Sequence, residues 1–388
     1  MTYVLPYADT MDQYIATLIG SHIRRVKLTL MDLNHSSLGD ISNLLVNGQV
    51  DGDASADITR SLKLDLADVG NRLQLDSGGP TDGSLFMDRM IGVTEVTINP
   101  VTRMSWECPI FTGPIRKLSR GSSVVSLECQ GKEVLSMVDL WKGQTFKKGT
   151  KKSDVIKQIM IDLAGENKLD VTDRPADLGD KTSIKDGSQP WAVVKNLAAG
   201  LDCRAFYDGS GKFVSRRNSD KVAFTFNSEG ISPDSLAWGF DISTVKNVVK
   251  VIGAKPKGKG KGHYTYTAKA PRNHPLSPAN LGRTNKSGVF VPLILGVTIN
   301  DQSLKSNKEC QDRAERDLNR YLREGLDASF TGAIIPFLEE GDVVKINTGD
   351  TGFSFNYTKW SIPLLPGDMA VNFNKKVSPN DRIKSRRK

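Results

Sequence analysis

The sequence lacks any long hydrophobic run. No apolar stretch in its 388 residues approaches the roughly 20 residues that cross a bilayer as a helix, so we predict no membrane-spanning segment. Met1 to Gly20 carries Asp9 and Asp12 but no lysine or arginine, and a secretory leader needs a basic start, so we expect no export signal. Hydrophobic residues make up 38% and charged residues 25% of the chain, which is typical of a globular protein in water.

Cysteine and histidine are scarce. The chain has four of each, and no two cysteines form a C-x-x-C pair. They are Cys108, Cys129, Cys203 and Cys310, with His22, His35, His263 and His274 distant from them in the sequence. Because this spacing does not suit a zinc site, we predict buried free thiols, no metal and no cofactor.

The common catalytic motifs are missing. The sequence contains no H-E-x-x-H, no G-x-S-x-G and no G-x-x-x-x-G-K-[ST]. Lys257–Gly262 looks like a glycine-rich phosphate loop, but it lacks the preceding strand and following helix, so we favour a surface loop over an anion site. Asp51–Asp57 has the carboxylate density of a calcium loop, yet Ala56 replaces the required glycine and Leu62 the closing glutamate. We predict a hairpin turn there and no catalytic residue.

Glu339 and Glu340, with Asp342, are the best candidates for paired catalytic acids. Adjacent residues on a strand point to opposite faces, which works against a shared site. We therefore predict that they form a solvated turn after Pro336. Trp191 lies at helical spacing from other apolar residues, and we assign it to a core rather than to a ligand platform.

Short strands with a period of two dominate residues 1–146. Apolar residues alternate with polar ones, as expected of antiparallel sheet with one buried face, in the runs around Val26–Leu30, Leu62–Leu66, Val96–Ile98 and Val125–Cys129. Residues typical of turns separate these runs, at Asn47-Gly48, Asp51-Gly52, Asp76–Pro80 and Arg120–Ser123. A short helix over residues 10–21 can precede them. This pattern predicts an N-terminal β-barrel-like domain.

Residues 147–218 predict a small α+β module. A helix begins near Ser153, and a second begins at Pro190, because proline suits the first turn of a helix. Arg204–Tyr207 and Lys212–Ser215 then flank a glycine-containing turn and predict a hairpin. We expect these two helices and the hairpin to pack together.

Residues 219–388 predict a second β-barrel-like domain with one inserted helix. The helix spans about 303–326, where Cys310, Ala314, Leu318 and Leu322 fall on one stripe. Charged residues one turn apart predict ion pairs on its outer surface, at Glu309/Arg313, Asp312/Arg316 and Arg313/Asp317. The domain ends in a basic tail.

The net charge of +9 is concentrated in two segments. They hold the candidate basic contact residues, which are Lys255, Lys257, Lys259, Lys261, Arg386 and Arg387. The rest of the chain is close to neutral, so overall basicity is weak evidence for nucleic-acid binding.

The order of these parts resembles the tail-tip or baseplate hub family of bacteriophages, especially the minor tail proteins of siphophages. The similar segments are Arg25–Leu30, Ser153–Ile159, Gln189–Ala199 with Ala205–Phe213, Lys246–Val251, and the late helix with Pro336 and Gly341–Val344. The resemblance implies two barrel-like domains per chain, which a homotrimer arranges into a pseudo-sixfold ring. Such a ring adapts a hexameric tail tube to a threefold tip.

The resemblance also implies a location and partners. The location is the virion tail tip, after synthesis in the host cytoplasm. The partners are the distal tail or tail tube protein, the tape-measure protein, other tail-tip or fibre proteins, and DNA that passes through the lumen without sequence-specific binding. The chain ends soon after its second β domain, so we expect no enzyme activity. A tail-associated cell-wall hydrolase and, less favoured, a DNA-binding protein remain as alternatives.

Overall fold

The fold is described from a computed structural model. It describes residues 11–69, 73, 84–86, 88–139, 143–179, 181–217, 219, 221–232, 235–240, 245–256, 262–302, 304–322, 326–348 and 351–375. Contacts divide the chain into two compact units. The first comprises Met1–Leu236, Phe330–Gly352 and Tyr357–Asn372, and the second comprises Ala237–Ser329, Phe353–Asn356 and Phe373–Lys388.

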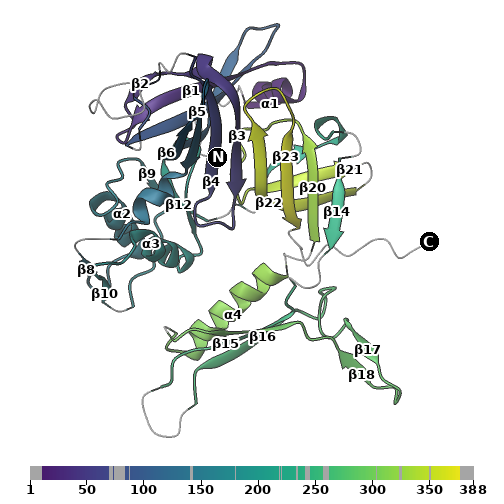
Figure 1. The fold of residues 1–388 in the computed structure, drawn as a ribbon. Coiled ribbons are helices and arrows are strands. Elements are labelled where there is room, and N and C mark those ends of the chain that lie inside the picture. The colour runs from purple at the N-terminus through teal and green to yellow at the C-terminus, as the bar shows by residue number, and fades with distance from the viewer. Residues whose placement is uncertain are drawn as a thin grey trace. The chain divides into compact units, whose positions relative to one another are not determined.

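A large and mainly antiparallel sheet forms most of the first unit (Figure 1). The N-terminal elements are α1 (Met11–Ile19), β1 (Ile23–Asp32), β2 (Ser37–Asp40), β3 (Leu45–Asp53), β4 (Arg60–Ala67), β5 (Arg89–Ile98), β6 (Ser105–Arg120) and β7 (Val124–Gln130). The later elements are β13 (Val222–Phe226), β20 (Leu326–Gly332), β21 (Val343–Thr348), β22 (Thr351–Pro363) and β23 (Met369–Lys375). The strand order includes β23-β22-β3-β4-β7-β6-β5-β1-β2, so late strands pair with early ones.

Burial in this sheet follows the alternation of the sequence. Leu62, Leu64 and Leu66 of β4 are buried, and Val125, Leu127 and Cys129 of the neighbouring β7 lie opposite them. The prediction of a mainly β protein is confirmed. The described strands do not close into a barrel, because the sheet that they form has two edge strands that do not pair with each other.

The long strand β6 pairs with different neighbours along its length. Its first part pairs with β5 and its last part with β7, and its register shifts between Ile115 and Lys117. Such a bulge bends a strand and increases its twist. At Gly113 a Cβ atom would lie 1.9 Å from the carbonyl oxygen of Gln130, so only glycine permits this approach.

Two predicted turns lie inside a strand instead. Gly48 and Gly52 both belong to β3, so assigning Asn47-Gly48 and Asp51-Gly52 to turns was wrong. The chain turns after Asp53, whose Oδ1 accepts a hydrogen bond from the backbone N–H of Ser55. A Cβ atom at Gly52 would lie 2.3 Å from the indole of Trp360, so this glycine makes room for a side chain on β22.

The predicted helices and hairpin of the module are confirmed within the first unit. The elements are β8 (Gln144–Phe146), α2 (Lys152–Asp162), β9 (Leu169–Val171), β10 (Thr182–Ile184), α3 (Pro190–Ala199), β11 (Arg204–Tyr207) and β12 (Phe213–Arg216). Both helices contribute to one apolar cluster with the hairpin. Trp191 is buried in that cluster, as predicted.

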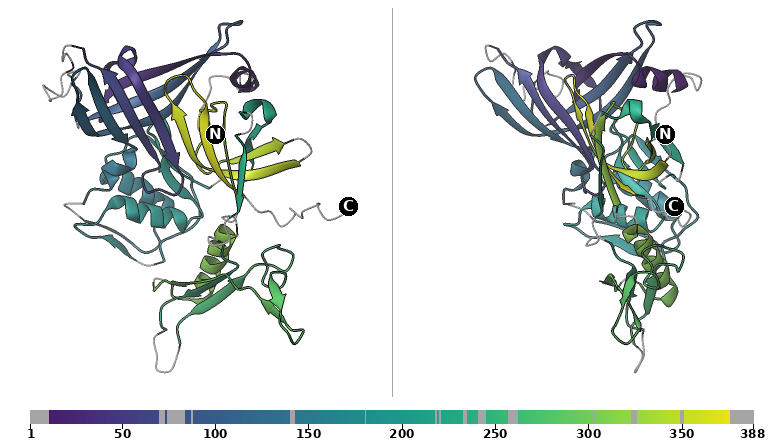
Figure 2. Two further views of the ribbon diagram at one scale, coloured as in Figure 1. Left: turned by 45° about the vertical axis from the view of Figure 1, so that its right-hand side comes forward. Right: turned by 90° about the vertical axis from the view of Figure 1, so that its right-hand side faces the viewer.

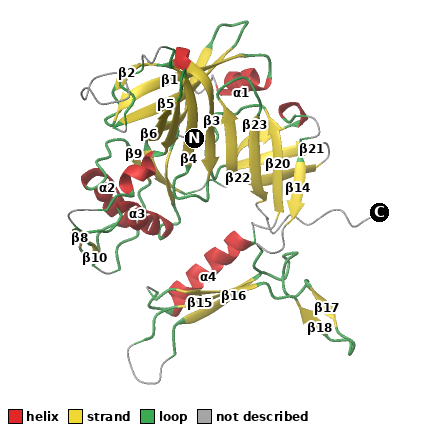
Figure 3. Cartoon of the chain, in the orientation of Figure 1, coloured by secondary structure: helices red, strands yellow, loops and turns green. Residues whose placement is uncertain are grey.

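The second unit contains a smaller sheet and the late helix (Figures 1 and 3). Its elements are β14 (Ala237–Phe240), β15 (Val248–Ile252), β16 (Thr265–Lys269), β17 (Gly282–Thr284), β18 (Phe290–Pro292), β19 (Gly296–Asn300) and α4 (Asn307–Tyr321). The sheet has the order β16-β15-β19, and β17 pairs only with β18 in the described chain. Figure 2 shows this helix, sheet and hairpin from two further sides.

The predicted stripe of the late helix is confirmed. Cys310, Ala314, Leu318 and Leu322 pack with Val249, Val251 and Ala268 of β15 and β16. The predicted pair of Arg313 and Asp317 forms, with 2.6 Å between Nε and Oδ2. Asp312 pairs with Lys308, and a Glu309 side-chain oxygen accepts a hydrogen bond from the backbone N–H of Lys305.

Candidate functional site

Arg60 is the centre of a buried charge cluster in the first unit. Its Nε donates to Glu340 at 3.0 Å, its Nη1 donates to the carbonyl of Ile110 at 2.9 Å, and its Nη2 donates to Glu339. Trp360 lies against the guanidinium at 5.5 Å and donates its own N–H to Glu340 at 3.1 Å. Arg60 and both glutamates are almost completely buried.

This cluster overturns the predicted solvated turn. Glu339 and Glu340 lie in a turn beyond the end of β20, so the alternation of a strand does not apply, and both carboxylates reach one guanidinium. Asp342 holds the turn by accepting the backbone N–H of Glu339 at 3.0 Å. Burial raises the pKa of Glu339, and the Arg60 charge opposes that rise.

A sequence signal for the cluster was missed. Arg60 stands in phase with Leu62, Leu64 and Leu66 on β4, and its buried position continues theirs. A cation on the buried face of a strand requires carboxylate partners. The Glu339-Glu340 pair was the obvious source, although it lies 279 and 280 residues further along the chain.

The same cluster fixes the module to the sheet inside the first unit. Arg204 of β11 donates from Nη1 to the backbone carbonyl of Glu340 and lies 4.8 Å from the ring of Phe206. On the next strand, Arg216 approaches Asp342 at 3.7 Å. A charged interior thus joins β4, β11, β12 and the turn before β21.

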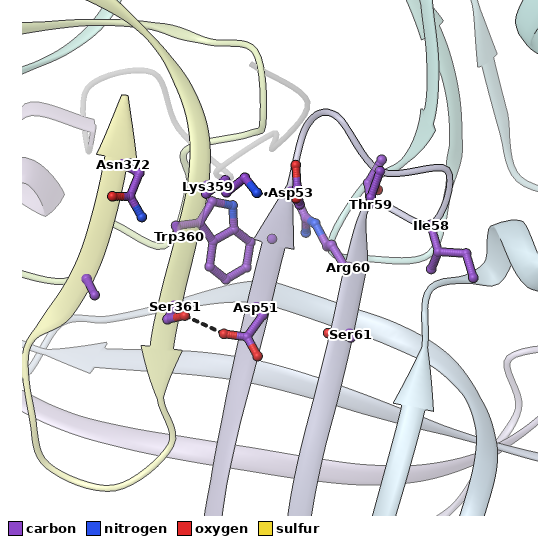
Figure 4. A pocket seen from close by; sticks show the side chains of 13 residues that line it. Asp51, Asp53, Ile58, Thr59, Arg60, Ser61, Lys359, Trp360, Ser361 and Asn372 are labelled. Carbon is purple, nitrogen blue, oxygen red and sulfur yellow. Dashed lines mark hydrogen bonds and ion pairs between the residues drawn. The ribbon is translucent and has the colours of Figure 1, made fainter. Parts of the chain in front are cut away.

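A pocket of about 350 Å³ lies beside Arg60 (Figure 4). Its lining includes Asp51, Asp53, Lys359, Trp360 and Ser361 from β3 and β22. These polar groups are engaged with one another: Lys359 pairs with Asp53 at 2.9 Å, and Ser361 donates to Asp51. Burial alone would raise the pKa of Asp53, but hydrogen bonds from Ser55 and Lys359 outweigh it and lower that pKa.

A second buried ion pair contains Lys132. Its Nζ contacts Glu166 at 2.5 Å and His35 Nε2 at 2.7 Å, and lies 5.2 Å from the ring of Tyr207. His35 has a positive φ of 67°, a conformation uncommon for residues other than glycine. Burial and the charge of Lys132 lower the pKa of His35 to about 4.

An exposed apolar segment stands out in the second unit. Val289, Phe290, Val291, Leu293 and Ile294 are between 42% and 58% exposed. They follow the tip of the β17–β18 hairpin and continue to β19. We call residues 289–294 the apolar arm. A two-stranded hairpin is marginally stable alone, and contiguous exposed apolar residues often mark an interface.

The predicted basic contact residues are placed only in part. Lys255 is exposed shortly after β15. Lys257, Lys259, Lys261, Arg386 and Arg387 lie outside the described residues, so their role stays a prediction.

All four cysteines are free and buried, as predicted. Burial raises the pKa of the Cys108 and Cys129 thiols. Within the described ranges, no group of His, Cys, Asp and Glu side chains could hold a metal ion. None of the helices there combines the length and apolar character that a membrane crossing requires.

The fold is similar to that of solved tail proteins, two of which come from prophages. A tail protein from Neisseria meningitidis superimposes with a TM-score of 0.59 and 12% identity over 90% of this chain and 97% of that one. The 43 kDa tail protein of prophage MuSo2 from Shewanella oneidensis gives a TM-score of 0.59 and 12% identity over 91% and 98%. Prophage tail protein gp18 from Listeria monocytogenes gives 0.53 and 11% over 90% and 94%.

Sequence comparison adds no further relative. No protein-family model matches the chain, and neither does any curated protein sequence. The resemblance to phage tail proteins predicted from the order of the segments is confirmed at the level of the fold.

Proposed function

We propose that the chain is a structural hub protein at the tip of a bacteriophage tail. Three copies form a pseudo-sixfold ring that adapts a hexameric tail tube to a threefold tip. The proposal is carried by the fold match to two tail proteins, which spans 97% and 98% of their lengths. The proposal includes the ring and its contacts with the tube, tape-measure and fibre proteins. It also includes the division of the chain into three domains, with boundaries after residues 146 and 218.

The apolar arm supports assembly with further chains. Because Phe290 and Ile294 are about half exposed, completing their burial on a neighbouring subunit would contribute about 1 kcal/mol each. The buried cluster at Arg60 also supports a structural role, because its charged groups form ion pairs with one another inside the protein. A cell-wall hydrolase needs accessible acids, whereas Glu339 and Glu340 are 2% exposed.

Mass measurement and imaging test the proposal together. We expect mass photometry of the purified protein to show a trimer, and antibody-labelled electron microscopy to place the protein at the tail tip. Phe290→Asp should shift the trimer to monomer. Ile161→Asp, at an exposed site on α2, is the matched control and should keep the trimer. A monomeric wild-type protein that is absent from virions would refute the hub.

A further inference from the structure

A long segment of the second unit contains only positively charged side chains. Residues 242–300 contain ten lysines and arginines and neither aspartate nor glutamate. The whole second unit holds 23 basic and 9 acidic residues, a net charge of +14, whereas the first holds 30 and 35, a net charge of −5. The excess charge of the protein therefore belongs to one unit.

The fold brings part of this charge onto one face of a sheet. Val249, Val251 and Ala268 point toward α4, so the alternate residues of β15 and β16 point away from it. The exposed residues on this second face are Lys250, Thr265, Thr267, Lys269, Thr298 and Asn300. We call them the cation face. Each of these side chains can donate hydrogen bonds, and none carries a negative charge.

The two lysines of the cation face have no ion-pair partner in the part of the chain that the structure describes. Lys250 lies opposite Thr267 and Lys269 lies opposite Val248, so the two lysines are diagonal neighbours on adjacent strands. Neither has an acidic group within 4 Å among the described residues. The helix on the other face behaves differently, because Lys308 pairs with Asp312 at 2.7 Å.

We propose that the cation face binds the phosphate backbone of double-stranded DNA without reading its sequence. Lysines supply charge, while threonine and asparagine supply hydrogen-bond donors, and phosphate contacts need both. An acidic protein is a weaker candidate, because protein interfaces centre on apolar residues. In this unit the exposed apolar residues belong instead to the apolar arm. The inference rests on the proposed hub function for its biological context, since the resemblance implies that DNA passes through the lumen of such a hub.

Fluorescence anisotropy of the full-length protein with labelled duplexes tests this inference. We use two 30-base-pair duplexes of unrelated sequence, and we expect their dissociation constants to agree within about twofold. Affinity should fall at least about tenfold between 50 and 200 mM NaCl, since two or more phosphate contacts release counterions. Unlabelled poly-glutamate serves as the competing polyanion without phosphate.

Two double variants with the same charge change locate the site. Lys250→Glu with Lys269→Glu should weaken binding at least about tenfold at 100 mM NaCl, because two phosphate contacts are lost. Lys308→Glu with Arg316→Glu alters α4 instead and should weaken it less than about threefold. Lys250→Gln with Lys269→Gln, which removes charge without reversing it, should show the intermediate loss in a folded protein.

Several outcomes would overturn the inference. Equal losses of affinity in the two charge-reversed variants would show that binding depends on the net charge of the protein and not on the cation face. A loss confined to Arg386→Glu with Arg387→Glu would place the contact in the C-terminal segment. Competition by poly-glutamate as strong as that by unlabelled duplex would indicate an acidic protein ligand. Absence of binding at 50 mM NaCl would also refute it, yet would leave the trimer measured by mass photometry untouched.

Discussion

The two units differ in how much charge they bury. The first unit buries charged side chains such as Arg60, Lys132 and Glu340 and neutralises them through close ion pairs. The second unit forms its described core mainly from apolar residues of β15, β16 and α4, with Asp317 as a buried charge that pairs with Arg313. Lysines such as Lys250 lie on its surface. Buried ion pairs therefore hold the parts of the first unit together, whereas the surface lysines of the second unit can contact a ligand.

This difference predicts different sensitivities to substitution. A buried ion pair that loses one partner leaves an uncompensated charge in a medium of low polarity, which destabilises a protein strongly. An exposed ion pair is solvated and contributes about 0–1 kcal/mol. The same kind of substitution should therefore have unequal effects in the two units.

The largest effect is expected from Arg60→Met. The substitution removes the guanidinium that both Glu339 and Glu340 contact, and should lower the free energy of unfolding by about 3–5 kcal/mol. Urea denaturation followed by circular dichroism measures it. Lys308→Met on α4, whose side chain is 71% exposed, is the control and should leave the stability almost unchanged. Similar losses in both variants would remove the contrast between the units.

A smaller effect, confined to the second unit, is expected from Leu318→Ala. The side chain is 5% exposed within the cluster of α4 and its sheet, so truncation should cost about 2–4 kcal/mol through lost burial and a cavity. Hydrogen exchange should show lower protection in β15 and β16, with β4 and β7 unchanged. Asn319→Ala, at an exposed position of α4, serves as control. Equal loss of protection in β4 would mean that the chain unfolds as one unit.

Local patterns were sufficient to predict much of the fold. The stripe of Cys310, Ala314 and Leu318 predicted α4, and the alternation of Leu62 to Leu66 predicted β4, because each pattern is set by neighbours a few residues away. Gly52 was misassigned because Asp-Gly pairs usually form turns. The indole of Trp360 and the carboxylate of Glu340, which both come from distant parts of the chain, account for glycine at that position.

The candidate sites depended on distant pairings and were harder to predict. The Arg60 cluster joins residues 280 positions apart. The pattern of β4 placed Arg60 on a buried face and the two acids were visible, but no local pattern paired one with the other. The cation face was hidden for a different reason. Its two lysines come from strands whose register decides which face they share, and that register was not predictable from the sequence.

The smallest effect should come from pH acting on the first unit. Burial and Lys132 lower the pKa of His35 to about 4, below its usual value of 6.5. Between these values the unfolded chain binds a proton that the folded chain does not, so stability is complete above pH 6.5 and falls as the pH drops toward 4. Because the side chain is partly exposed, we expect a loss of about 1 kcal/mol. His35→Asn tolerates the positive φ and removes the titrating group, so its urea midpoint should change less between pH 7 and pH 5. The same pH dependence in both proteins would show that other groups, rather than the buried Lys132 pair, control the acid response.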